Sequence, residues 1–308
     1  MSSVSLLGPQ FRTPNLRGVV AALGLQGPFV SISAGWQERE GELDELRAHL
    51  DADVHDLRIY ERSERVFEQD MVLRGEHRQR QSDLQEMREL YQLQLTHAKD
   101  TARELFARDG SPALLRRARR QAIAALHRLD HAHLAAIRTI HREFAARTNL
   151  PDRPAVASAA AQIGRYVQQA NAVFIAGGHV AVLLNRLRLL GGAALFAGKP
   201  IVAWSAGAMA LTDVVALFHD SPPQGRSNVE VFDAGLCLVN RVIVLPHAAT
   251  RLHLDDAARV RILARRFAPA RCLTLDTGAE LQFSDGNFLG GTGSRRLRRD
   301  GSLAELDI

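Results

Sequence analysis

The pattern of apolar and polar residues divides the chain into three zones. Short apolar runs alternate with helix-forming segments over residues 1–60, and the same pattern returns over residues 148–308. Runs of this kind are typical of buried strands, and strands that alternate with helices predict an α/β fold with a doubly wound, mostly parallel sheet. The runs expected to be strands are 4–7, 29–33, 54–60, 172–176, 200–204, 242–247, 272–275, 279–283 and 287–289.

Residues 61–147 carry a different pattern, which is charged, almost free of proline and apolar at every third or fourth position. That spacing indicates helix. The one interruption, Arg108-Asp-Gly-Ser-Pro112, has the serine N-cap and first-turn proline of a helix start. The zone therefore predicts a long antiparallel, coiled-coil-like hairpin, with arms of about 50 Å at 1.5 Å per residue. It is expected to be inserted into one discontinuous α/β domain formed by 1–60 and 148–308.

Composition narrows the class of protein. A chain of 308 residues that is 46% hydrophobic can bury a full core. It contains no apolar run of membrane-spanning length and no signal-like N-terminus, so a cytoplasmic protein without a membrane partner is expected. Cys237 and Cys272 show no CxxC spacing and are expected to be buried small residues rather than a disulfide or a metal site. The net charge of +5 comes with no aromatic-interleaved basic stripe, which disfavours nucleic acid as a partner.

The apolar run before residue 205 ends on a serine that very small residues follow, in Lys199-Pro-Ile-Val-Ala-Trp-Ser205-Ala-Gly-Ala-Met-Ala210. Small neighbours let a strand-to-helix turn close tightly, and the following helix points its N-terminal amides at the reacting centre. Ser205 is therefore a candidate nucleophile. The pattern is AxSxG rather than GxSxG, and a plain helix packed on a sheet or a phosphate-binding turn would use similar residues.

Two further features lie at the ends of neighbouring apolar runs. Gly177 and Gly178 end the run before that of Ser205, and His247 ends the run after it. The glycine amides, together with the amide of Ala206, could hold an oxyanion, and His247 could act as general base. Doubly wound sheets place their sites at the carboxyl ends of strands, where all of these residues are expected. An ordinary glycine turn and a surface histidine are the alternatives.

A third group would orient the imidazole, and three acids are candidates. Asp220 follows Ser205 on an expected loop above the sheet. Asp276 ends a later strand, and Glu280 lies beyond it. Each also fits a solvated loop acid.

Two other clusters point less clearly to chemistry. His127 and His131 are four residues apart on the expected hairpin, which is compatible with a metal site but equally with a soluble helix face. Gly290-Gly-Thr-Gly-Ser294 resembles a phosphate loop but is not followed by a helix, so a hairpin turn is expected. Neither a metal nor a cofactor is expected.

Taken in order, these motifs resemble the dipeptidase E and cyanophycinase family of serine peptidases, which have a flavodoxin-like, class I glutamine amidotransferase-like α/β fold. The resemblance covers about residues 150–308 and, more loosely, the first 60. It implies that Ser205 is the nucleophile, that His247 is the base, and that the Gly178 and Ala206 amides face the oxyanion. The matching segments are Phe174-Ile-Ala-Gly-Gly-His179, Ala203-Trp-Ser-Ala-Gly-Ala208, Phe232-Asp-Ala-Gly-Leu236, Val244-Leu-Pro-His247, the helix around Arg259-Val-Arg261, Leu275-Asp-Thr-Gly-Ala279 and Phe288-Leu-Gly-Gly291.

The chain also departs from the family pattern. The family's glycine triplet reads Ala176-Gly177-Gly178, and its catalytic glutamate falls at Thr277, which cannot serve as an anion. Asp220 matches a family aspartate position and is the preferred substitute. Asp276 is one residue from Thr277 but is expected to point to the other side of the strand end.

We therefore expect a serine hydrolase that cleaves a small peptide or related amide through an acyl-enzyme at Ser205. Family members favour acidic residues next to the scissile bond, so Arg251, Arg226 or Arg259 is expected to hold a carboxylate. The helical hairpin is not a usual family feature and is expected to cap the site, form a homodimer or recruit a partner. The alternative function is a catalytically impaired binding or scaffold protein with the hairpin as its interaction module. Amidotransferase chemistry on glutamine is disfavoured because the nucleophile position holds serine, not cysteine.

Overall fold

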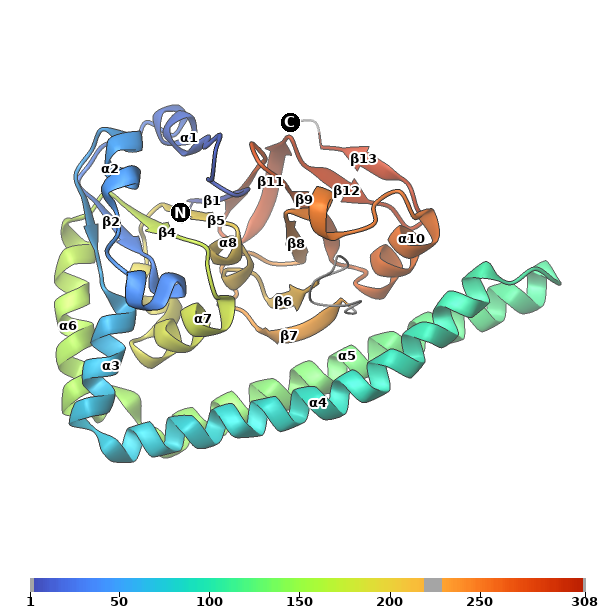
Figure 1. Cartoon of the computed structure of the whole chain (residues 1–308), viewed down its shortest axis with the longest axis horizontal. Coiled ribbons are helices and arrows are strands. Elements are labelled where there is room, and N and C mark those ends of the chain that lie inside the picture. Colours follow the sequence, from blue (N-terminus) through green and yellow to red (C-terminus); the bar gives the residue numbers. More distant parts are fainter. Residues whose placement is uncertain (1–2, 219–228, 307–308) are drawn as a thin grey trace.

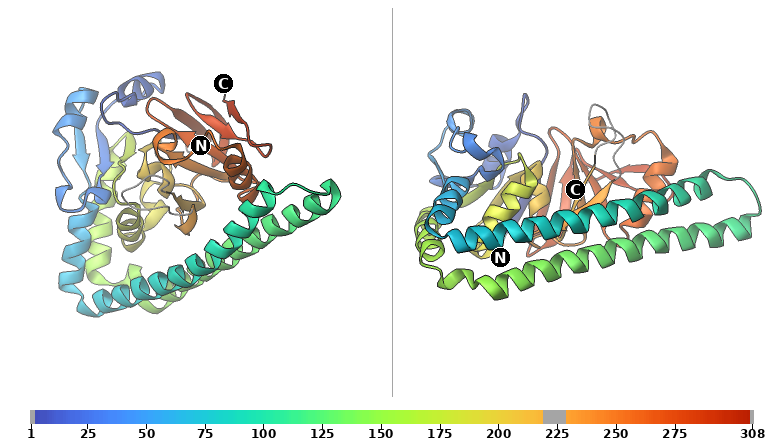
Figure 2. Two further views of the ribbon diagram at one scale, coloured as in Figure 1. Left: turned by 45° about the vertical axis from the view of Figure 1, so that its right-hand side comes forward. Right: turned by 60° about the horizontal axis from the view of Figure 1, so that its bottom comes forward.

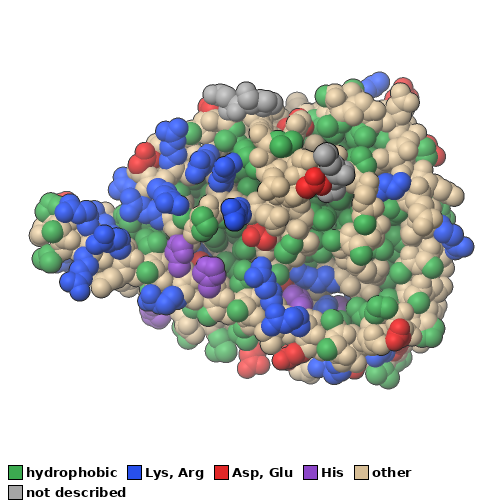
Figure 3. Space-filling view, turned by 180° about the vertical axis from the view of Figure 1, so that it is seen from behind, with side chains coloured by type: hydrophobic (Ala, Val, Ile, Leu, Met, Phe, Trp, Pro, Cys, Tyr) green, Lys and Arg blue, Asp and Glu red, His purple; other side chains and the backbone are tan. Residues whose placement is uncertain are grey.

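The computed structural model describes residues 3–218 and 229–306. It consists of an α/β body and a long helical hairpin that runs under the body and projects beyond it (Figures 1 and 2). On the rear face, arginine and lysine side chains gather on the hairpin and on the body beside it, with fewer acidic ones among them (Figure 3). Among the described helices none is long and apolar enough to span a bilayer.

The body is built on a seven-stranded sheet in the order β11-β10-β1-β5-β4-β2-β3. Strands β1, β5, β4, β2 and β3 are parallel to one another. Strand β10 pairs antiparallel with β1, and β11 pairs antiparallel with β10. Their bounds are β1 Ser3–Leu7, β5 Ile201–Trp204, β4 Ala172–Ile175, β2 Phe29–Ile32, β3 Val54–Asp56, β10 Glu280–Ser284 and β11 Asn287–Thr292.

Helices cover both faces of the parallel strands, because successive residues of each strand point to opposite faces. Phe174 of β4 packs with Leu16 of α1, whereas its neighbours Val173 and Ile175 pack with α6 and α7 on the other face. This explains why the parallel strands read as unbroken apolar runs. The helices of the first face are α1 Leu16–Ala22 and α2 Asp44–Leu50, and those of the second are α3 Ile59–Gln69, α6 Pro154–Gln169 and α7 Val180–Leu189.

The remaining strands form two smaller sheets, a four-stranded sheet β13-β12-β9-β8 and the ribbon β6-β7. The strand that ends at His247, β8, pairs with β9 and not with the main sheet. Strands β8 and β9 therefore lie outside the main sheet, because β10 occupies the edge of β1 where a further strand would join. The flavodoxin-like assignment stays a prediction.

The bounds of these elements are β6 Val214–Leu217, β7 Glu230–Ala234, β8 Val242–Pro246, β9 Arg271–Leu275, β12 Arg295–Leu297, β13 Leu303–Glu305, α8 Ala206–Ala210, α9 Ala248–Arg251 and α10 Ala257–Arg266, with 3₁₀ turns η1 Ala34–Arg39, η2 Leu150–Asp152 and η3 Gly192–Phe196.

The helical hairpin consists of α4 (Met71–Ala107) and α5 (Pro112–Thr148), each 37 residues long and hence about 55 Å. The long antiparallel pair is as expected. It begins at Met71, because the preceding helix α3 packs into the core of the body through Val66 and Phe67. The division of the chain into two domains stays a prediction.

The segment 290–294 differs from the expected turn. Gly290 and Gly291 lie within β11, where they pair with β10. A Cβ at Gly291 would lie 2.6 Å from the carbonyl oxygen of Glu280, so the glycine serves close strand packing.

Candidate active site

Ser205 lies at a sharp turn between β5 and α8. Its backbone has φ 53° and ψ −120°, a conformation that costs a non-glycine residue about 1–3 kcal/mol. Its amide donates to the carbonyl oxygen of Leu7 at 3.1 Å. A side chain at Gly207 would collide with the carbonyl oxygen of Ile175, so the small residues after Ser205 let α8 begin directly against β4. The predicted strand-to-helix turn is present.

The glycine pair at the end of β4 lies against this serine. A Cβ on Gly177 would lie 3.0 Å from the Ser205 Cβ and 3.3 Å from its Oγ. Gly178 has φ 103°, and a side chain there would collide with the carbonyl oxygen of Gly35 in η1. No hydrogen bond among the described residues uses the amide of Gly178 or Ala206, which leaves both amides available to an oxyanion.

His247 closes β8 and begins the short helix α9, with φ 57° and ψ 31°. Its side chain is half-buried and lines a cavity of about 540 Å³ together with Ser205, Gly177 and Gly178. The structure thus brings the predicted nucleophile, base and glycine pair to one cavity, although His247 comes from the second sheet. Within the described part of the chain, no hydrogen bond joins the Ser205 hydroxyl to the imidazole.

Charges around His247 affect its protonation. Burial lowers the pKa of His247 below its ordinary value, the positive charge of Arg251 lowers it further, and the negative charge of Asp276 acts against both. A lowered pKa keeps the imidazole neutral at pH 7, which is the form that a general base requires.

Among the candidate acids that the structure describes, Asp276 is the one whose charge acts on His247. Its Oδ1 accepts a hydrogen bond from the amide of Ala249 at 2.9 Å, in the turn that His247 begins. The sequence predicts that Asp276 points to the other side of the strand end, but its carboxylate instead faces this turn. Glu280 lies on β10, where it accepts from Gln282 at 2.9 Å. Asp220 lies outside the described residues.

The predicted substrate-binding arginines are separated. Arg251 is the last residue of α9 and is partly buried beside His247. Arg259 lies on α10 and lines a different cavity. Arg226 lies outside the described residues.

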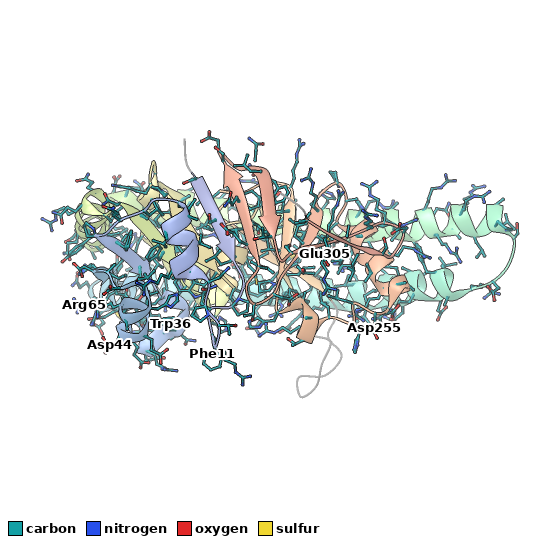
Figure 4. The ribbon with its side chains drawn as sticks, turned by 90° about the horizontal axis from the view of Figure 1, so that it is seen from above. Phe11, Trp36, Asp44, Arg65, Asp255 and Glu305 are labelled. Carbon is teal, nitrogen blue, oxygen red and sulfur yellow. The ribbon has the colours of Figure 1, made fainter. Side chains whose placement is uncertain are left out.

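Several residues around the cavity carry no motif and were missed by sequence reasoning. Phe11 and Arg12 come from the loop after β1, and Trp36 comes from η1. Phe11, 74% exposed, and Trp36 lie near each other on the side of the molecule that also carries α2 (Figure 4). The acidic residues Glu42 and Glu45 complete this rim. The only signal for Phe11, Arg12 and Trp36 was their position after the carboxyl end of a parallel strand, β1 or β2.

A strained serine followed by small residues, a histidine and a glycine pair lie at one cavity. The region that contains them, residues 136–289, is half of the chain and matches peptidase family S51, the dipeptidase E family. The chain therefore belongs to this family, and a peptidase function is supported.

Two solved structures are similar at low identity. A peptidase from an acI-B1 Actinobacterium is 14% identical, with 99% of this chain and 97% of that chain covered and a TM-score of 0.43. A putative peptidase E protein from Listeria monocytogenes EGD-e is 13% identical, with 97% of this chain and 100% of that chain covered and a TM-score of 0.44. Among curated proteins none matches the chain.

Proposed function

We propose that this protein is a serine peptidase that cleaves a small peptide or related amide through an acyl-enzyme at Ser205. The observation that carries the proposal is the conformation of Ser205, held at positive φ at the start of α8 and facing the same cavity as His247. Strained backbone of this kind is characteristic of serine nucleophiles at strand-to-helix turns. Membership of a peptidase family supports a peptidase function as well.

The proposed reaction follows from the positions of these groups. The Ser205 Oγ attacks the carbonyl carbon of the scissile amide while its proton passes to the His247 imidazole. The amides of Gly178 and Ala206 donate hydrogen bonds to the oxyanion of the tetrahedral intermediate. His247 then gives the proton to the leaving amine, the C–N bond breaks, and water hydrolyses the ester by the same route.

In this scheme Asp276 is a positioning residue. Its carboxylate holds the amide of Ala249, in the turn that presents His247, and its negative charge stabilises the imidazolium that forms during attack. Arg251 is proposed to bind a substrate carboxylate, because it is a partly buried cation beside His247.

A fluorophosphonate probe tests the nucleophile. The wild-type chain should become labelled on Ser205, and the variants Ser205→Ala and His247→Ala should lose labelling. Ser111→Ala, which changes an exposed serine at the hairpin turn, is the matched control and should label as wild type. With a dipeptide library, Ser205→Ala should reduce cleavage at least about 10³-fold.

The same labelling experiment distinguishes the proposed peptidase from the alternative, a catalytically impaired scaffold. The lack of a Ser205–His247 hydrogen bond among the described residues favours that alternative, although such bonds often tighten only with substrate bound. A folded wild-type chain that neither labels nor cleaves would support the scaffold. Labelling that survives Ser205→Ala would place the nucleophile elsewhere.

A further inference from the structure

A second cavity lies where the hairpin joins the body. It has a volume of about 480 Å³ and shares no lining residue with the cavity of Ser205. Pockets of about 300–1,000 Å³ with mainly apolar walls are typical of small-molecule sites. Its apolar walls come from α5, η2, α6 and the end of α7, and include Phe144, Leu150, Val156, Ala160 and Leu190.

One wall of this cavity contains a buried arginine. Arg80 of α4 lines the cavity and is only 2% exposed. Its Nη2 donates to Asn185 Oδ1 at 3.2 Å, and its guanidinium lies 4.1 Å from the centre of the Phe144 ring. Its Nε is buried without a hydrogen-bond partner, and no carboxylate among the described residues forms an ion pair with it.

The neighbouring charges do not neutralise Arg80. Arg186 pairs with Glu64, and Arg188 pairs with Asp233 at 2.8 Å. Among residues 3–218 and 229–306, two carboxylates thus pair with two of these three guanidinium groups, and the charge of Arg80 is in excess. His141 also lines the cavity, and its Nε2 is hydrogen-bonded at 2.8 Å to Asp233, the same carboxylate that pairs with Arg188.

The pKa of Arg80 agrees with an excess of positive charge around it. Burial lowers the pKa of Arg80 to about 10, and the positive charges of Arg188 and Arg186 contribute to the decrease, with Asp233 opposing it. At neutral pH the guanidinium is still charged. An uncompensated charge of this kind inside a protein is costly unless an anion pairs with it.

We propose that this cavity binds a small amphipathic carboxylic acid of the medium-chain fatty acid class, with its carboxylate at Arg80 and its hydrocarbon chain against Phe144, Val156 and Leu190. A guanidinium offers a carboxylate two parallel hydrogen bonds, and a single excess charge matches a monoanion. The apolar walls exclude a heavily hydrated polyanion, whose remaining charges would be left without partners. The proposal is independent of the proposed peptidase function.

The cavity also lies against a helix that follows the glycine pair of the candidate active site. Its wall includes Leu189, the last residue of α7, and that helix begins at Val180, two residues after the glycine pair. A ligand in this cavity would contact the same helix that follows the Gly177–Gly178 turn.

Binding of octanoate to the full chain, measured by isothermal titration calorimetry, tests the proposal. Wild type should bind octanoate, and octan-1-ol, which has the same chain without the charge, should bind at least tenfold more weakly. Arg80→Met should weaken octanoate binding at least tenfold. Arg142→Met, on the exposed side of α5, is the matched control and should bind octanoate as wild type.

A second pair of variants covers the case in which Arg80→Met does not fold. Ala160→Phe fills the cavity from α6 and should abolish octanoate binding, whereas Ala161→Phe changes the exposed neighbouring position and should not. Absence of octanoate binding by the folded wild-type chain would overturn the proposal. Equal octanoate binding by Arg80→Met and Arg142→Met, or by Ala160→Phe and Ala161→Phe, would overturn it as well.

Discussion

The interior of the body is apolar, whereas the contact between body and hairpin combines apolar packing with buried charge pairs. In the body, the strands that carry the site are buried apolar runs, and every residue of β4, β5 and β8 is buried. The hairpin contacts the body through an apolar cluster that includes Leu126 and Ile262, and also through buried polar and charged side chains. Asp130 of α5 accepts from Arg266 of α10 at 2.7 Å through both Nε and Nη2, and from Tyr91 of α4 at 2.8 Å.

Further polar contacts join the hairpin to the ribbon β6-β7. Glu230 of β7 accepts from Arg88 and Gln92 of α4, and Asp233 pairs with His141 of α5. Apolar packing tolerates many neighbours, whereas buried charges are stable only with their own partners. The comparison teaches that buried charge pairs determine how the hairpin docks on the body, whereas apolar burial determines how the body folds.

The largest expected effect on this comparison comes from breaking the Asp130–Arg266 pair. Asp130→Ala leaves Arg266, 3% exposed, without its carboxylate and should lower the free energy of unfolding by about 3–5 kcal/mol. The double variant Asp130→Leu/Arg266→Met removes both charges and should recover most of the loss. Urea denaturation measures both. A double variant as unstable as the single one would show that apolar packing, not charge pairing, dominates here.

A glycine from each region gives the next test. Gly178→Ala forces a side chain against Gly35 at positive φ and should displace the amide proposed to hold the oxyanion. The rate of fluorophosphonate labelling should fall about 10²–10³-fold. Gly75→Ala, in α4 with open space around it, should leave labelling unchanged and stabilise the hairpin by about 0.5–1 kcal/mol. Equal labelling by the two variants would contradict the role of Gly178.

The base of the hairpin should make stability depend on pH. His77 of α4 packs against Phe67 with ring centres 4.8 Å apart, and burial, together with the charges of Arg80 and Arg186, lowers its pKa to about 3. The unfolded chain takes up this proton near pH 6.5 and the folded chain only near pH 3, so stability falls as the pH falls through that interval. The loss should be about 2 kcal/mol between pH 6.5 and pH 5.

His77→Phe should remove this contribution. Unfolding free energies of wild type and variant, measured at both pH values, give the difference in slope. Parallel slopes would show that His77 takes up a proton as readily in the folded chain as in the unfolded chain.

The smallest expected effect concerns His247. Arg251→Met removes a cation that lowers the pKa of His247, so the acid limb of the kcat/KM profile should move to higher pH. Asp276→Asn removes the opposing charge and should move the limb to lower pH. If Arg251 binds a substrate carboxylate, Arg251→Met should also raise KM. Shifts in the same direction for both variants would exclude the proposed electrostatics.

The local pattern predicted the elements and the central turn well. The apolar run 200–204 and the small residues after Ser205 led directly to β5 and α8. The helical hairpin followed from its spacing of apolar residues. The sequence did not predict that β8 lies in a second sheet, because pairing depends on which strand occupies the edge of β1, and no local pattern records that.

The sequence by itself determined where strands, helices and the turn at Ser205 occur, because the apolar spacing and the small residues that favour them are properties of neighbouring residues. Only the tertiary structure decided that His247 reaches the cavity from a second sheet, that Asp276 faces its turn and that Arg80 is buried with no ion pair to any described carboxylate. Those outcomes depend on contacts between residues far apart in the chain, whose strength is set by burial and by the charges that folding brings together.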